Sequence, residues 1–213
     1  MTAATVLALR ESQLVPVVTI TALDEVDAIA DGLVAGGVGC VEITLRTPHG
    51  VEAIRRMAAR GDLVVGAGTV LDEESLHAAA EAGAAFLVSP GLDERLVRSA
   101  GERGLLPLPG VATATEVQHA RRIGLRHVKL FPISTLGGAS LVEALHPPFP
   151  EMSFMPSGGV TSESAPRYLA HPAVFAVGAS WLVRTSSGEG LAERVSGLSR
   201  DSVRSLARAA DDG

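Results

Sequence analysis

The stretch RHVKLFPIS, residues 126–134, has the pattern of a buried β-strand that contains a lysine. Side chains of a strand alternate between its two faces, so Lys129 lies on the same face as His127 and Phe131. A charged side chain among residues that pattern as core needs a partner or a function. The architecture around this strand decides between the two.

Short apolar runs of this kind recur along the whole chain. Each is followed by a cluster of Gly, Pro, Ser or Thr and then by a segment of helical periodicity, with a period of about 20–25 residues. The eight predicted strands are VPVVTI (15–20), CVEITL (40–45), LVVGA (63–67), AFLVS (85–89), LLPLP (105–109), HVKLF (127–131), SFMPS (153–157) and VFAVG (174–178). Such alternation indicates parallel strands covered by helices.

An open doubly wound sheet and a closed barrel both satisfy this alternation. Eight units of one period, with no GxGxxG fingerprint after the first strand, favour the barrel. No linker or low-complexity segment interrupts the series. The sequence therefore predicts an α/β protein: a single (β/α)8 TIM barrel domain over residues 1–213, with a short N-terminal helix.

Helix signals support the segments between the strands. The segment 23–37 ends in a glycine pair, and the segment 71–83 carries acidic residues in its first turn. In TATEVQHARRIG (113–124), the spacing of Thr115 and Gln118 predicts a capping box.

Composition narrows the class of protein. The chain has 213 residues, 46% of them hydrophobic, a net charge of −6 and no cluster of Lys or Arg, which argues against nucleic acid or an anionic membrane as its main partner. A single cysteine, Cys40, excludes an intramolecular disulfide framework and fits a reducing compartment. With no signal-peptide pattern and no apolar run of about 18 residues, we expect a cytoplasmic protein that does not span a membrane.

The second strand carries a carboxylate on its inner face. In CVEITLRT (40–47), alternation places Glu42 inward with Cys40 and Thr44. Strands two and six of eight lie on opposite sides of a closed barrel, so Glu42 and Lys129 are expected to converge at its centre. The plain alternative is a structural ion pair, or a lysine that reaches solvent at the barrel mouth.

A lysine and a carboxylate at the mouth of this fold also suit a specific chemistry. The free amine of a lysine attacks a ketone to form a Schiff base, and the protonated imine then accepts electrons from a breaking carbon–carbon bond. A carboxylate within reach can move the protons that these steps require.

Two glycine-containing loops follow the last two strands, where barrels of this fold commonly bind phosphate. PSGGVT (156–161) supplies Gly158 and Gly159, and VGASW (177–181) supplies Gly178 and Ser180. Glycines also serve turns that have no ligand, but two such loops at the two expected places favour a phosphate site.

Other strand ends carry weaker candidates. Arg46, just past the second strand, could grip a carboxylate through two hydrogen bonds or simply be solvated. Thr69 could contact a ligand or cap a helix, and the turn at Pro90 has backbone geometry as its default explanation. The six histidines form no HxH or HExxH spacing, so we expect no metal and no cofactor.

Taken together, these motifs resemble the class I 2-keto-3-deoxy-6-phosphogluconate (KDPG) aldolases, which include 4-hydroxy-2-oxoglutarate (KHG) aldolases. The similar segments span roughly residues 12–184 and include VEITLRT, VGAGTVLDEE, PLPGVATATE, VKLFP, PSGGVT and VGASWLV. The resemblance implies a (β/α)8 barrel, a homotrimer, no metal, and reversible cleavage of KDPG to pyruvate and glyceraldehyde 3-phosphate.

The resemblance also implies roles for individual residues. Lys129 would form the Schiff base, Glu42 would be the general acid and base, and Arg46 would contact the pyruvyl carboxylate. The remaining substrate-binding residues would be Thr69, Pro90, Phe131, Gly158, Gly159, Gly178 and Ser180.

The chain departs from the family pattern at three places. FPIS stands where F-P-A-E is commonest, so Ile133 and Ser134 replace a small residue and a carboxylate; Ser157 stands where threonine is frequent; and GAS stands where GGS is frequent. These changes leave open the galacto-configured phosphate or the shorter 4-hydroxy-2-oxoglutarate as substrate, and ATATE (112–116) also resembles the galactonate-type relatives.

The residues are also compatible with a sugar-phosphate isomerase or epimerase whose lysine is only electrostatic, and with a non-catalytic phosphate-binding module.

Overall fold

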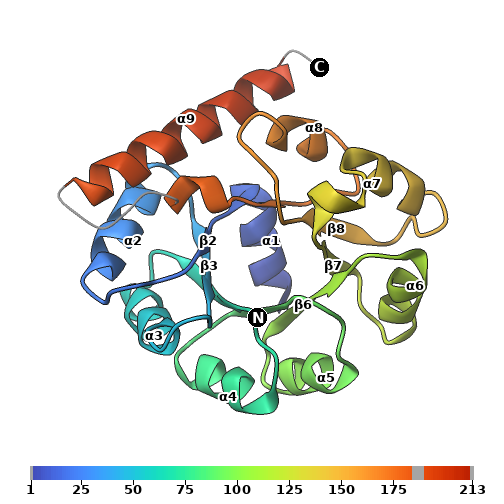
Figure 1. Ribbon diagram of the computed structural model, residues 1–213, viewed down its shortest axis with the longest axis horizontal. Helices are drawn as coiled ribbons and strands as arrows, with labels where there is room; N and C mark the ends of the chain where they lie inside the picture. Colours follow the sequence, from blue (N-terminus) through green and yellow to red (C-terminus); the bar gives the residue numbers. More distant parts are fainter. Residues whose placement is uncertain (1, 184–189, 212–213) are drawn as a thin grey trace.

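The computed structural model describes residues 2–183 and 190–211, and its strands form a ring that is surrounded by helices (Figure 1). The strands are β1 Leu14–Val15, β2 Val17–Val18, β3 Cys40–Thr44, β4 Val64–Gly68, β5 Phe86–Ser89, β6 Leu106–Val111, β7 His127–Leu130, β8 Ser153–Pro156 and β9 Val177–Gly178. The helices are α1 Thr2–Ser12, α2 Glu25–Ala35, α3 Gly50–Arg60, α4 Glu73–Glu81, α5 Glu94–Glu102, α6 Ala114–Arg122, α7 Ala139–Leu145, α8 Ala165–Leu169 and α9 Leu191–Asp211, with 3₁₀ turns η1 Ile133–Leu136 and η2 Ser180–Val183.

The strands are parallel and pair in chain order. β2 to β8 form one seven-stranded sheet, and β1 pairs with β9. β1 and β2 belong to one extended segment that is interrupted at Pro16, a residue with no N–H to donate, whose carbonyl accepts from the Glu42 N–H at 2.8 Å. The Phe154 N–H donates to the Ala173 carbonyl at 2.7 Å and joins β8 to the segment that enters β9.

These joins close the ring, so the predicted (β/α)8 barrel and its short N-terminal helix are confirmed. Each of the eight predicted strands has a counterpart. The last is the shortest: of VFAVG only Val177–Gly178 forms a strand, and Val174 contributes an isolated bridge to Phe154.

One predicted helix start is wrong. The capping box of α6 joins Thr113 and Glu116, not Thr115 and Gln118: the Glu116 N–H donates to Thr113 Oγ1 at 3.3 Å, and Glu116 Oε2 accepts from the Thr113 N–H at 2.9 Å. The sequence holds two overlapping motifs of the same spacing. The carboxylate prevails because it also accepts from the Ala112 N–H at 2.8 Å, and charged acceptors form stronger hydrogen bonds than amides.

Two apolar clusters hold the barrel together. The outer one lies between the strands and the surrounding helices, whereas the inner one fills the barrel and contains Leu9, Val15, Cys40, Phe86 and Met155. Leu9 comes from α1, which lies against β1, β3, β4 and β6 where these strands begin. The N-terminal end of the barrel is therefore plugged, which leaves its C-terminal end for the site.

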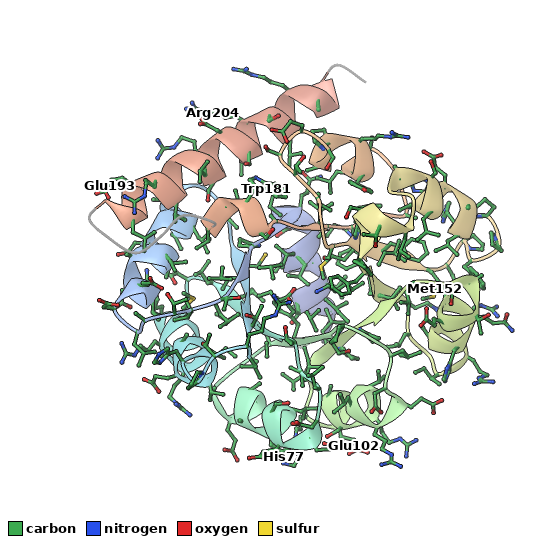
Figure 2. The ribbon with its side chains drawn as sticks, in the orientation of Figure 1. His77, Glu102, Met152, Trp181, Glu193 and Arg204 are labelled. Carbon is green, nitrogen blue, oxygen red and sulfur yellow. The ribbon has the colours of Figure 1, made fainter. Side chains whose placement is uncertain are left out.

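Helix α9 packs along α2, the first helix of the outer ring. A β-carbon at Gly32 of α2 would lie 2.6 Å from Val195 Cβ of α9, and one at Gly36, which caps the C-terminus of α2, would lie 2.3 Å from Ser199 Cβ. Both glycines are therefore needed for this close approach (Figure 1). Trp181 of η2 donates from Nε1 to Ser202 Oγ of α9 at 3.1 Å (Figure 2). Among the described helices, none is both long enough and apolar enough to cross a bilayer.

Cys40 is expected to be unreactive in the folded protein. Burial raises the pKa of its thiol to about 12 from an ordinary value of 9.0, and a hydrogen bond with Ser12 opposes this only in part. Because the thiolate is the nucleophile, 5,5′-dithiobis(2-nitrobenzoate) at pH 8 should label Cys40 only after unfolding in guanidinium chloride. Labelling of the native protein at the rate of a free thiol would contradict this.

The raised pKa of Cys40 also makes stability depend on pH. With rising pH, the thiol of the unfolded chain loses its proton before the thiol of the folded protein does, so the contribution of Cys40 to stability is lost as the pH rises from about 9 to 12.

Candidate active site

Lys129 and Glu42 meet inside the C-terminal end of the barrel, as the alternation of their strands predicts. Lys129 Nζ lies 3.5 Å from Glu42 Oε1, and the two side chains are 9% and 1% exposed. The ammonium also lies 5.2 Å from the centre of the Phe131 ring, so its surroundings are apolar on one side. Side chains fill the centre of the ring of strands (Figure 2).

A glycine on the neighbouring strand makes room for the carboxylate. A β-carbon at Gly68 of β4 would lie 2.3 Å from Glu42 Oε1, so a side chain at this position would displace the carboxylate. Glu42 Oε2 is buried and has no hydrogen-bond partner among the described residues. Buried polar atoms are normally paired, so one carboxylate oxygen is held beside the lysine and the other is left for a ligand or water.

Arg46 and Thr69 follow the ends of β3 and β4 and touch each other. Arg46 Nε donates to Thr69 Oγ1 at 3.1 Å, and Thr69 has a φ of +59°, a left-handed conformation that a β-branched residue rarely adopts. No carboxylate forms an ion pair with Arg46 in the described part of the chain. Its two terminal nitrogens are therefore available to bind an anion such as a carboxylate.

The two glycine loops lie at the same end of the barrel. Gly158 and Gly159 follow β8, and both have a φ of +85°, which side chains strongly disfavour. Gly178 ends β9, and Ser180 begins η2 with an exposed side chain. Neither glycine has a side chain, so a ligand such as phosphate can approach the backbone of this loop closely.

Ser157 is a site residue that the sequence pattern indicates only as a departure from the family. Its side chain is 2% exposed, and its hydroxyl has no hydrogen-bond partner among the described residues. A β-carbon at Gly178 would lie 2.3 Å from Ser157 Oγ, so the two residues pack directly against each other. Alternation could have found it, because Met155 of β8 points into the barrel and Ser157 is two residues farther along.

Pro90 is exposed just past β5, and its carbonyl oxygen would lie 2.1 Å from a β-carbon at Gly110. Gly110 is the register partner of Lys129 between β6 and β7. The turn at Pro90 thus packs against β6, the strand that pairs with the lysine strand, although no contact of the described residues assigns it a ligand. No group of three or more His, Cys, Asp or Glu side chains in residues 2–183 and 190–211 is arranged to hold a metal ion.

Comparisons with known proteins match most of the chain to one family. The family profile described as "Aldolase: KDPG and KHG aldolase" matches residues 6–195. A 2-dehydro-3-deoxy-phosphogluconate aldolase of Pseudomonas aeruginosa is 42% identical over 200 residues, which are 93% of this chain and 91% of that relative.

Two solved structures are similar over nearly the whole chain. The 2-keto-3-deoxy-6-phosphogluconate aldolase of Zymomonas mobilis ZM4 with 3-phosphoglycerate has 37% identity and a TM-score of 0.89, covering 95% of this chain and 96% of that one. KDPG aldolase from Legionella pneumophila, with pyruvate captured at low pH as a covalent carbinolamine intermediate, has 31% identity and a TM-score of 0.86, covering 92% and 97%. The chain therefore belongs to the KDPG and KHG aldolase family.

Proposed function

We propose that this protein is a Schiff-base aldolase that reversibly cleaves KDPG to pyruvate and glyceraldehyde 3-phosphate. The observation that carries the proposal is the buried pair of Lys129 and Glu42, with Nζ 3.5 Å from Oε1, at the open end of the barrel. Binding of a phosphorylated ligand alone does not require two opposed ionisable groups in a desolvated place, and burying them is costly. A catalytic role accounts for both.

In the proposed reaction, the free amine of Lys129 attacks the C2 ketone carbon. The carbinolamine hydroxyl then takes a proton from Glu42 and leaves as water, which gives a protonated imine and a Glu42 carboxylate. Glu42 takes the proton of the C4 hydroxyl, the C3–C4 bond breaks, and its electron pair moves to the imine to form an enamine. The aldehyde leaves, C3 takes up a proton, and hydrolysis releases pyruvate and restores the amine. The unpartnered Glu42 Oε2 and the carbinolamine of the Legionella relative support this route.

The two ends of the substrate would be held on opposite sides of the lysine. Arg46, positioned by Thr69, would bind the carboxylate next to the reacting ketone. Gly158, Gly159 and Ser180 would bind the phosphate through backbone N–H groups and a hydroxyl. The 3-phosphoglycerate in the Zymomonas relative supports a phosphorylated ligand. Phe131 would wall the pocket beside the lysine, while Pro90 and Gly178 would shape it.

The test is reductive trapping. Incubation of the enzyme with pyruvate and sodium borohydride should leave a reduced pyruvyl adduct on the peptide that contains Lys129, as read by peptide mass mapping, and borohydride without pyruvate should leave none. An unmodified Lys129 with full activity after this treatment would contradict the proposal and favour an isomerase or epimerase.

Assays of pyruvate release from the gluco and galacto phosphates and from 4-hydroxy-2-oxoglutarate would rank the substrates. The homotrimer and the cytoplasmic location stay predictions.

A further inference from the structure

We propose that Ser134 binds the substrate phosphate through its hydroxyl, a contact that the carboxylate commonest at this position in the family cannot make. The inference rests on the proposed function and extends the phosphate site to a second loop, the one that follows the lysine strand. The resemblance assigns no role to Ser134, which it marks only as a departure.

Backbone hydrogen bonds join the loop after β7 to the loop after β8. The Ile133 N–H donates to the Ser157 carbonyl at 2.9 Å, and the Ser134 N–H donates to the Gly158 carbonyl at 3.1 Å. The start of η1 is therefore attached to the glycine pair, and its position relative to that pair is set by the backbone.

This attachment places the Ser134 side chain directly on Gly159. A β-carbon at Gly159 would lie 2.2 Å from Ser134 Oγ and 2.5 Å from Ser134 Cβ, so Ser134 occupies the place that any other side chain at position 159 would need. Both residues are exposed. A ligand bound at the glycine loop would therefore lie close to this hydroxyl.

The hydroxyl of Ser134 is uncommitted, in contrast with its neighbour. Among the described residues no hydrogen bond involves Ser134 Oγ, whereas Thr135 Oγ1 in the same turn donates to the Pro132 carbonyl at 3.0 Å. A hydroxyl beside backbone N–H groups can donate to a phosphate oxygen, and a hydrogen bond to a charged acceptor is stronger than one to a neutral acceptor. Thr135 is a matched control, because it has the same functional group in the same turn.

The experiment compares wild type, Ser134→Ala and Thr135→Ala. KM and kcat are measured for pyruvate release from KDPG and from its unphosphorylated counterpart. Ser134→Ala should raise KM for KDPG about tenfold with little change in kcat or in either parameter for the unphosphorylated acid. Thr135→Ala should match wild type.

A second measurement does not depend on turnover. The dissociation constant of inorganic phosphate, from isothermal titration calorimetry, should rise about tenfold in Ser134→Ala and stay unchanged in Thr135→Ala. The Ser134 proposal is overturned if wild type binds no phosphate, if Ser134→Ala binds it as tightly as wild type, or if both variants weaken binding equally. Failure of wild type to release pyruvate would instead contradict the proposed function, and the phosphate titration would still decide the role of Ser134.

Discussion

Replacement of Lys129 by methionine is expected to lower the rate of pyruvate release by about 10⁴-fold or more. The imine cannot form without the amine, and enzymes that lose a covalent nucleophile lose activity on this scale. Methionine keeps the length and the apolar stem of lysine, so it should fill the space beside Phe131 without displacing it. The measurements are kcat/KM for KDPG and the thermal unfolding curve from circular dichroism.

The Lys129→Met variant has a predictable cost in stability. It leaves Glu42, whose side chain is 1% exposed, without its cationic partner, and breaking a buried pair from one side costs about 3–5 kcal/mol. The double variant Lys129→Met/Glu42→Gln removes both charges, so it should be equally inactive but more stable than the single one. A single variant that keeps activity within about tenfold of wild type would show that cleavage does not require an imine on Lys129.

The sequence predicts the fold and the central pair because both depend on periodic patterns. Strand alternation assigns Glu42 and Lys129 to the inner face, and the order of parallel strands in a closed barrel sets them opposite each other. These two regularities bring the pair together at the barrel centre, whereas the distance of 3.5 Å between Nζ and Oε1 also needs the space that Gly68 leaves for the carboxylate. Strand ends are less predictable because a single residue such as Pro16 can divide a strand without changing its apolar pattern.

Other features of the site depend on contacts that no local pattern encodes. The unpartnered hydroxyl of Ser157 is a property of its surroundings, since the same residue in a different barrel could meet an acceptor. The contact between Ser134 and Gly159 brings together two loops that follow different strands, and neither loop alone indicates it. Two capping motifs overlap at the start of α6. The one with Glu116 forms because the Glu116 carboxylate accepts from the Ala112 N–H as well as from the Thr113 N–H.

Replacement of Glu42 by glutamine is expected to lower kcat for KDPG by about 10²–10⁴-fold, the usual contribution of a positioned general acid or base. Glutamine has nearly the same shape, so it can occupy the space that Gly68 leaves, but its amide cannot take the proton of the C4 hydroxyl. Lys129 is still present, so borohydride should still trap pyruvate on it, although more slowly. Single-turnover kinetics with KDPG would show whether the slow step is bond cleavage or imine formation.

The combination of outcomes separates the role of Glu42 from that of Lys129. Trapping that persists while cleavage is lost assigns proton transfer to the carboxylate, because a variant that had merely misplaced the lysine would lose both. Glu52→Gln is the matched control: Glu52 is an exposed carboxylate on α3 that pairs with Arg55 and Arg56, so its removal should leave turnover unchanged. If Glu42→Gln cleaves KDPG at the wild-type rate, another group must move the proton, and the buried hydroxyl of Ser157, through a water molecule, is the next candidate.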